Sequence, residues 1–326
     1  MKSAAALALL VGAGVWPLTQ PGWGQQYRRF TRTPYYRGPD DPERNQVRGT
    51  LRLGETVVIE IPGGADADLK PGVVPDPHVT KPRGSRRGGP FAIEGIKAGD
   101  WVAIRILAVE PGPYGYYNNY GPFRGPLRTV APVSNGMLHF PPDFVVPVRP
   151  MIGTIYLEPA SAAQSAAWDH GGNLDCNSVR AGSTVYIRAQ VDGGMLTISD
   201  THAYQGDGEL TGTGVEIDTT VTIQVDRGRE FPTGGVVVET PEKWFTFGIG
   251  ANWEEALKIA WTEMVGLLAH LHNTTAEHAN RIVGTIGDAV PGFAAGNMNN
   301  RGFRNPQAYV TCQIGIPKSL RRTGQK

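Results

Sequence analysis

Histidines and carboxylates gather in the middle of the chain, in a segment that is otherwise apolar and rich in glycine. Residues 168–175 read WDHGGNLD, and residues 199–209 read SDTHAYQGDGE. Carboxylate oxygen and neutral imidazole nitrogen are ordinary zinc ligands, and an incomplete protein shell leaves a position for water. The candidate metal ligands are Asp175, Asp200 and His202, with His170 as a fourth.

A hydrolytic metal site also needs a group that takes a proton from water and returns it to the leaving group. Glu94 is the leading candidate for this general base, and Glu209 and Asp288 are further candidates. Turn chemistry alone also selects Asp-Gly and Gly-Gly pairs. The alternative interpretation is therefore that these carboxylates are solvated loop residues.

Two predicted strands would position these groups. Residues 182–191 alternate β-branched or aromatic with polar residues, which predicts a strand, and residues 195–199 predict the next one. The Gly193-Gly194 pair predicts a hairpin turn between them. In such a hairpin Asp175 precedes the first strand, while Asp200 and His202 follow the second, so the two ends can be neighbours.

The rest of the chain predicts a mainly β (α+β) architecture, namely a β-sandwich or barrel-like sheets with a C-terminal helical hairpin. Residues 54–61 and 99–106 begin with the same glycine-led turn and then alternate. Asn252 predicts an N-cap, and apolar residues follow at helical spacing. Thr274 and Glu277 form a capping-box pattern for a second helix that ends near Val283.

The N-terminal residues are typical of a secretory signal peptide. Lys2 precedes an apolar run that is too short to span a bilayer, and small residues follow it. We expect a signal peptide over residues 1–24, an arm over 25–48 and one domain over 49–326. We therefore expect the protein to be periplasmic or secreted, without stable insertion in a membrane.

The charge balance argues against nucleic acid as a partner. The sequence holds 31 basic and 30 acidic residues, for a net charge of +1. We expect instead a small-molecule substrate and a homo-oligomer. Cys176 and Cys312 are the two cysteines, and whether they form a disulfide stays open. Cys176 adjoins Asp175, but a buried structural thiol is favoured over a nucleophile because the chain lacks a Cys-His spacing pattern.

Longer motifs carry a family resemblance. Residues 171–175 (GGNLD), 181–186 (AGSTVY) and 200–209 (DTHAYQGDGE) resemble the signature of the acetamidase/formamidase family. Residues 89–100 (GPFAIEGIKAGD), 284–288 (GTIGD) and 316–319 (IPKS) resemble further family segments. Residues 112–148 and 290–306 depart from the family pattern. The resemblance implies a β-rich fold and hydrolysis of an amide.

Together these observations predict an exported, metal-dependent amidohydrolase that cleaves a small carboxamide, similar to formamide or acetamide, to a carboxylate and ammonia. The expected cofactor is a divalent ion, with zinc favoured and calcium as the alternative. Two alternatives stay open: a hydrolase of cyclic, lactam-type amides, and a non-catalytic exported β-sandwich that binds calcium or a carbohydrate.

Overall fold

A computed structural model of the chain describes residues 27–31, 46–63, 87–118, 128–161, 167–293 and 309–322. The predicted signal peptide, residues 1–24, lies outside the described residues. So do most of the predicted arm and most of the departure at 290–306. None of the helices in the described part of the chain combines the length and the apolarity needed to cross a bilayer.

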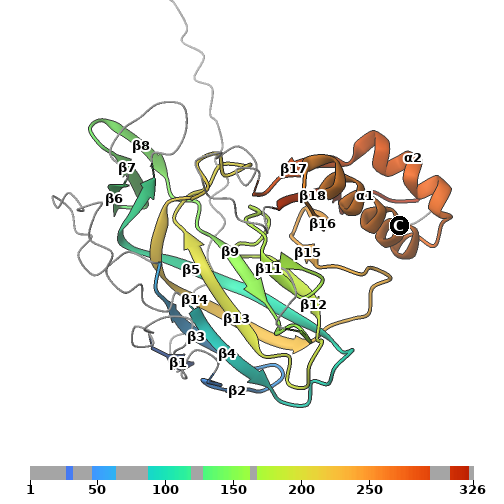
Figure 1. The fold of residues 1–326 in the computed structure, drawn as a ribbon, viewed down its shortest axis with the longest axis horizontal. Helices are drawn as coiled ribbons and strands as arrows, with labels where there is room; N and C mark the ends of the chain where they lie inside the picture. The colour runs from blue at the N-terminus through green and yellow to red at the C-terminus, as the bar shows by residue number, and fades with distance from the viewer. Residues whose placement is uncertain are drawn as a thin grey trace, which may run out of the picture.

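The described residues form a mainly antiparallel sheet that curls on itself like half a barrel (Figure 1). Its strands are β1 (Arg28–Phe30), β2 (Gly49–Leu51), β3 (Thr56–Ile61), β4 (Arg87–Ile93), β5 (Trp101–Asn118), β6 (Arg128–Ser134), β7 (Met137–Phe140), β8 (Phe144–Pro147), β9 (Met151–Tyr156), β10 (Ala167–Trp168), β11 (Gly171–Asn173), β12 (Thr184–Arg188), β13 (Leu196–His202), β14 (Glu216–Arg227), β15 (Val237–Glu239), β16 (Lys243–Gly250), β17 (Asp288–Pro291) and β18 (Val310–Pro317).

Period-two alternation builds the core of this sheet. β14 alternates buried and less buried residues along most of its length and pairs with β3 on one side and β5 on the other. Ile59 lies opposite Val221 in that register, and both side chains are almost fully buried. Because successive side chains point to opposite faces, the apolar set of each strand lies on one face. The predicted mainly β architecture is confirmed.

Two helices cover one end of the sheet (Figure 1): α1 (Trp253–Leu271) and α2 (Ala276–Ile286). The predicted N-cap is confirmed, since the Asn252 side chain accepts the backbone N–H of Glu255 at 3.0 Å. α1 packs closely on β16, where a Cβ added to Gly248 would lie 1.8 Å from the Ala256 carbonyl oxygen. Only glycine allows this approach.

The N-cap of α2 is Thr275 rather than the predicted Thr274. The Thr275 hydroxyl accepts the backbone N–H of His278 at 3.2 Å. The backbone N–H of Thr274 instead donates to Ala269 and closes the end of α1. Thr274 therefore belongs to the connection between the helices.

The predicted hairpin between residues 182–191 and 195–199 is wrong. β12 pairs with β5 and β15, whereas β13 pairs with β4, β9 and β14. The carbonyls of Gly193 and Gly194 accept the backbone N–H groups of Ile93 and Glu158 instead of closing a two-strand turn. Long-range pairing thus overrides the local turn signal, and β13 runs on to include Asp200 and His202.

Candidate metal centre

His202 is held at the end of β13 by its two neighbouring strands. In the sheet register it lies opposite Met151 of β9 and Glu216 of β14. Its Nδ1 is 3.2 Å from the Met151 sulfur, and its Nε2 is 3.2 Å from Glu216 Oε1. The ring is fully buried. Strand pairing therefore fixes which ring nitrogen faces the carboxylates.

Carboxylates surround that nitrogen. Nε2 of His202 lies 3.5 Å from Asp200 Oδ1 and 4.0 Å from Glu209 Oε1. Two groups of three residues could each hold an ion. In each group, one ligand atom per residue lies within 4.8 Å of the other two. The groups are Asp175, His202 and Glu209, and Asp200, His202 and Glu216. We call these five residues the acidic cluster.

Three of the cluster carboxylates belong to residues with an unusual backbone conformation. Asp175, Asp200 and Glu209 have φ values of 47°, 57° and 42°, in the left-handed region that non-glycine residues rarely adopt. Gly153 of β9 provides space beneath them, since a Cβ there would lie 2.4 Å from Asp175 Oδ1. Strained residues of this kind concentrate at functional sites.

A second layer of side chains orients Asp175. The Asn173 amide donates to the Asp175 carboxylate, and the Gln205 amide donates to the Asp175 backbone carbonyl at 2.6 Å. The Thr154 hydroxyl lies 2.6 Å from Asn173 Oδ1 and 3.3 Å from Asp200 Oδ2. Such outer contacts are typical of metal sites, whose ligands are held by further hydrogen bonds.

Burial and mutual repulsion shift the protonation of the cluster. Burial raises the pKa of Asp175 well above its usual range, and the negative charges of Glu209 and Asp200 raise it further. Burial also raises the pKa of Glu209, to about 8. For His202, burial lowers the pKa, but the Glu216 charge and the hydrogen bond to Asp200 outweigh burial and raise it well above the usual value.

The donor set fits a divalent ion. Three buried carboxylates, a partly buried fourth and one buried imidazole are a costly group to enclose without a compensating cation. Asp175 Oδ1 is buried and has no hydrogen-bond partner among the described residues. An ion held between carboxylate oxygens and His202 Nε2 would satisfy that atom.

Three of the residues singled out in the sequence lie apart from the cluster. Glu94 is exposed in the turn after β4. Asp288 begins β17, also exposed, and forms an ion pair with Lys243. His170 is buried beside the Tyr156 ring, with its Nδ1 3.7 Å from Asp169. Of the catalytic candidates, the structure brings only Glu209 to the other site residues.

Glu216 is the cluster member that the sequence analysis did not single out. It opens β14, in register with His202. A charged residue at a core-facing position of an alternating strand is the signal that could have found it. Its role depends on strand pairing, which the local sequence does not reveal.

Cys176 does not have the surroundings of a nucleophile. Its thiol is buried and donates to the Leu174 carbonyl at 3.2 Å. Burial raises the pKa of Cys176 well above the usual value, so the thiolate is disfavoured. Cys176 and Cys312 are both free thiols in the structure.

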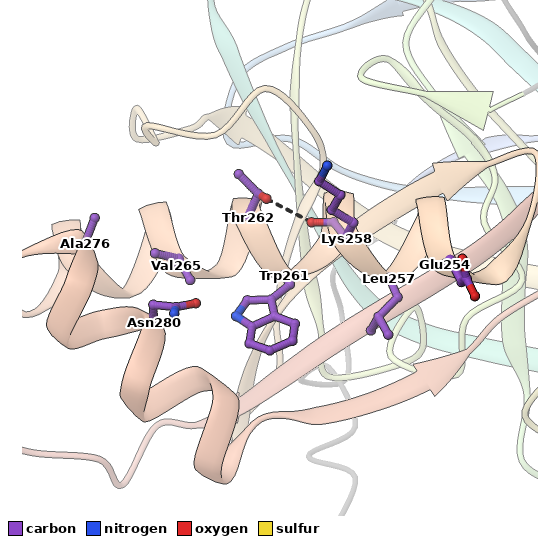
Figure 2. Close-up of a pocket in the computed structure, with 8 residues that line it drawn as sticks. All are labelled: Glu254, Leu257, Lys258, Trp261, Thr262, Val265, Ala276 and Asn280. Carbon is purple, nitrogen blue, oxygen red and sulfur yellow. Dashed lines mark hydrogen bonds between the residues drawn. The ribbon is translucent and has the colours of Figure 1, made fainter.

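A groove of about 690 Å³ lies elsewhere, over the two helices (Figure 2). Leu257, Trp261 and Val265 of α1 and Ala276 and Asn280 of α2 line most of it. None of its lining residues belongs to the acidic cluster. The groove is therefore separate from the acidic cluster at the end of β13.

Comparison with known proteins decides the family. The model of the acetamidase/formamidase family matches residues 151–313, half of the chain, and this range contains all five cluster residues. The chain belongs to the acetamidase/formamidase family. Members of this family are amidohydrolases that act on linear amides.

Curated relatives match over short segments. A formamidase of Methylophilus methylotrophus is 49% identical over 43 residues, which are 13% of this chain and 11% of the relative. A putative formamidase of Schizosaccharomyces pombe is 39% identical over 57 residues, which are 17% of this chain and 14% of the relative. The matches therefore span a small part of those proteins.

Solved structures match over nearly the whole fold. A predicted acetamidase/formamidase from Thermoanaerobacter tengcongensis has a TM-score of 0.75 at 21% identity, covering 90% of this chain and 96% of that one. An acetamidase from Bacillus halodurans has a TM-score of 0.73 at 24% identity, covering 89% and 97%. A gamma lactamase from Delftia acidovorans has a TM-score of 0.52 at 15% identity, covering 87% and 88%. These likenesses establish a shared fold.

Proposed function

We propose that this acetamidase/formamidase family member is a metal-dependent hydrolase that cleaves a small linear carboxamide to a carboxylate and ammonia. The observation that carries the proposal is the acidic cluster: three buried carboxylates and a partly buried fourth gather around the buried His202 ring inside the family-matched region. Asp175, Asp200 and His202, with Glu216, are the residues that would hold the ion.

An amide resists hydrolysis because its carbonyl is a poor electrophile and its nitrogen is a poor leaving group. A bound divalent ion polarises the carbonyl and lowers the pKa of water toward ~7. The chain must supply the proton transfers. Glu209 is suited to them because its Oε1 is farther from His202 Nε2 than the facing oxygens of Asp200 and Glu216. Burial raises its pKa to about 8 in the metal-free cluster, and a bound cation would lower that pKa and so favour the carboxylate form that accepts a proton.

Glu209 acts in both steps of the proposed reaction. As the water oxygen bonds to the carbonyl carbon, Glu209 takes the proton that water loses. As the carbon–nitrogen bond then breaks, Glu209 returns that proton to the departing nitrogen, and ammonia leaves. The carboxylate of Glu209 ends the cycle as it began it.

Zinc is the ion that we propose. Calcium takes oxygen ligands, whereas His202 presents a nitrogen at the centre of the cluster. The same nitrogen argues against the alternative of a calcium-binding β-sandwich without chemistry. Export, proposed from residues 1–24, places the enzyme in the periplasm or outside the cell.

An ammonia assay tests the reaction class. Zinc-loaded protein is incubated with formamide, acetamide, propionamide and a five-membered lactam. Ammonia release is measured for the linear amides, and ring opening is followed by chromatography. We expect turnover of at least one linear amide and none of the lactam. Turnover of the lactam alone would replace the proposal with the cyclic-amide alternative.

A further inference from the structure

Tyr309 reaches the acidic cluster from the far end of the sequence. It immediately precedes β18, and its hydroxyl is hydrogen-bonded to Asn173, the same side chain that donates to the Asp175 carboxylate. Tyr309 also interacts electrostatically with Asp175, Asp200 and Glu209. Its phenol therefore lies at the edge of the cluster.

Backbone contacts fix this placement. Gly208, which precedes Glu209, forms a parallel bridge with Phe293 and donates to the Pro291 carbonyl at 3.2 Å. The Phe293 ring packs against the Tyr309 ring, with centroids 5.7 Å apart. The end of β17 and the start of β18 thus form a wall beside Glu209, and Tyr309 belongs to that wall.

Thr311 ties the same wall to the Asp175 side of the cluster. Its hydroxyl donates to the Leu174 carbonyl at 2.7 Å and accepts the backbone N–H of Phe293 at 2.6 Å. Leu174 adjoins Asp175. The segment that carries Tyr309 is consequently held against the residues that precede Asp175 and Glu209.

The direction of the hydrogen bond at Tyr309 follows from the Asn173 side chain. Asn173 Oδ1 accepts from Thr154, and one amide hydrogen goes to Asp175. The second amide hydrogen remains for the phenol oxygen, and the hydrogen bond with Asn173 lowers the Tyr309 pKa. Burial nevertheless raises that pKa overall. The phenol thus stays protonated and keeps its own hydrogen to donate.

Such a donor would assist the proposed reaction in addition to the ion. Hydrolysis develops negative charge on the amide oxygen, and four carboxylates nearby oppose that charge. A preorganised O–H group aimed at the developing oxyanion offsets the repulsion. We propose that Tyr309 is a further catalytic residue, which donates a hydrogen bond to the carbonyl oxygen of the substrate as it becomes tetrahedral. This inference rests on the proposed amide hydrolysis.

Tyr309→Phe tests the role kinetically. The variant loses one oxygen and keeps the ring contact with Phe293. Tyr117→Phe is the matched control, because Tyr117 packs against Phe140 and takes no part in the cluster. For zinc-loaded Tyr309→Phe we expect kcat to fall about 10²–10³-fold, since the donor acts on the transition state. KM, zinc content and circular dichroism should stay close to wild type.

Two kinetic outcomes would overturn the proposal. One is a kcat for Tyr309→Phe within about twofold of Tyr117→Phe. The other is a fall in kcat matched by a proportionate loss of zinc, which would make Tyr309 a residue that positions ligands and not one that meets the substrate.

A binding measurement separates this proposal from the proposed function. Methylphosphonamidate mimics the tetrahedral stage of acetamide hydrolysis, and its affinity for the zinc-loaded proteins is measured by calorimetry. We expect Tyr309→Phe to bind it about tenfold or more weakly than wild type. Equal affinity, or no binding to either protein, would contradict the proposal. Tyr309-dependent binding by a protein that hydrolyses no amide would retain the hydrogen bond and reject the proposed substrate class.

Discussion

Two buried histidines near opposite ends of β9 show how carboxylates decide the chemistry of an imidazole. His170 lies near the Tyr156 end, where burial lowers its pKa and one carboxylate, Asp169, only partly offsets this. His202 lies at the Met151 end, where Glu216 and Asp200 reverse the effect of burial and raise the pKa. Both histidines are buried, so the opposite directions of their pKa shifts come from the number of carboxylates that face each ring.

This difference assigns different roles to the two side chains. One weakly compensated histidine in a core is a packing residue that stays neutral. For the histidine among four carboxylates we propose a ligand role, because that group of charges needs a compensating cation. The pairs of variants below test whether that distinction holds.

Removal of each ring should give the largest contrast. We expect His202→Ala to lose bound metal and at least ~10³-fold in kcat/KM, because the ion supplies several kcal/mol of transition-state stabilisation. His170→Ala should keep its metal and stay within about tenfold of wild-type activity. Metal content and ammonia release measured on both variants would check this. Equal losses in the two variants would abolish the distinction.

The carboxylate partners should repeat the contrast on a smaller scale. Asp200→Asn should weaken zinc binding by about 10–100-fold and abolish hydrolysis at limiting zinc. Asp169→Asn is the matched control and should leave zinc affinity unchanged, because Asp169 contacts His170 and Gln190. Competition with a chromogenic chelator measures both affinities. Unchanged zinc affinity in Asp200→Asn would remove this carboxylate from the site.

The pH dependence of stability should separate the sites in chelator-treated protein. The raised pKa of Glu209, about 8 against 4.5 for the usual value, means that folded protein holds a proton that unfolded protein releases. Stability from this group is present below pH ~4.5 and is lost as pH rises toward ~8. Metal-free wild type should therefore lose several degrees in Tm across that window.

Glu209→Gln should make that decline shallower, since the amide has no proton to lose, while the raised pKa values of Asp175 and His202 still act in the same direction. His170 acts in the opposite direction. Its lowered pKa means that stability is lost as pH falls below ~6.5, so this acid limb should survive in Glu209→Gln. Thermal melts between pH 5 and 8 would show both the loss of stability as pH rises and the loss as pH falls. If the Tm of metal-free Glu209→Gln fell with rising pH as steeply as that of wild type, the raised pKa of Glu209 would be contradicted.

Cys176→Ser should have the smallest effect on activity. The buried thiol contacts the Leu174 carbonyl and lies next to Asp175, so a hydroxyl there should cost about 1–2 kcal/mol of stability. We expect activity within about twofold of wild type at moderate temperature, with metal content retained. A metal-replete, inactive Cys176→Ser would restore the nucleophile hypothesis that the surroundings of Cys176 disfavour.

The sequence predicted the features that depend on residues close together in the chain. The Asn252 cap depends on a neighbour three residues away, and the alternation of residues 54–61 reflects one strand face. The motif around Asp200 and His202 could be read because its members lie two residues apart on one strand.

Long-range geometry could not be predicted in the same way. The turn signal at Gly193-Gly194 was outcompeted by strand partners far away in the sequence. Glu94 and Asp288 match family segments, yet strand pairing carries them to exposed positions. Glu216 joins His202 only through the register of β13 with β14, and Tyr309 joins Asn173 only through the path of β18. No local sequence pattern predicts these two long-range contacts.

The most direct test of the central claim is elemental analysis coupled to ammonia release on the purified mature protein, before and after chelation. The account predicts about one zinc per chain held by the cluster, loss of amide hydrolysis when a chelator removes it, and recovery when zinc is returned. Chelated protein that contains no metal and hydrolyses the amide at the full rate would contradict the account.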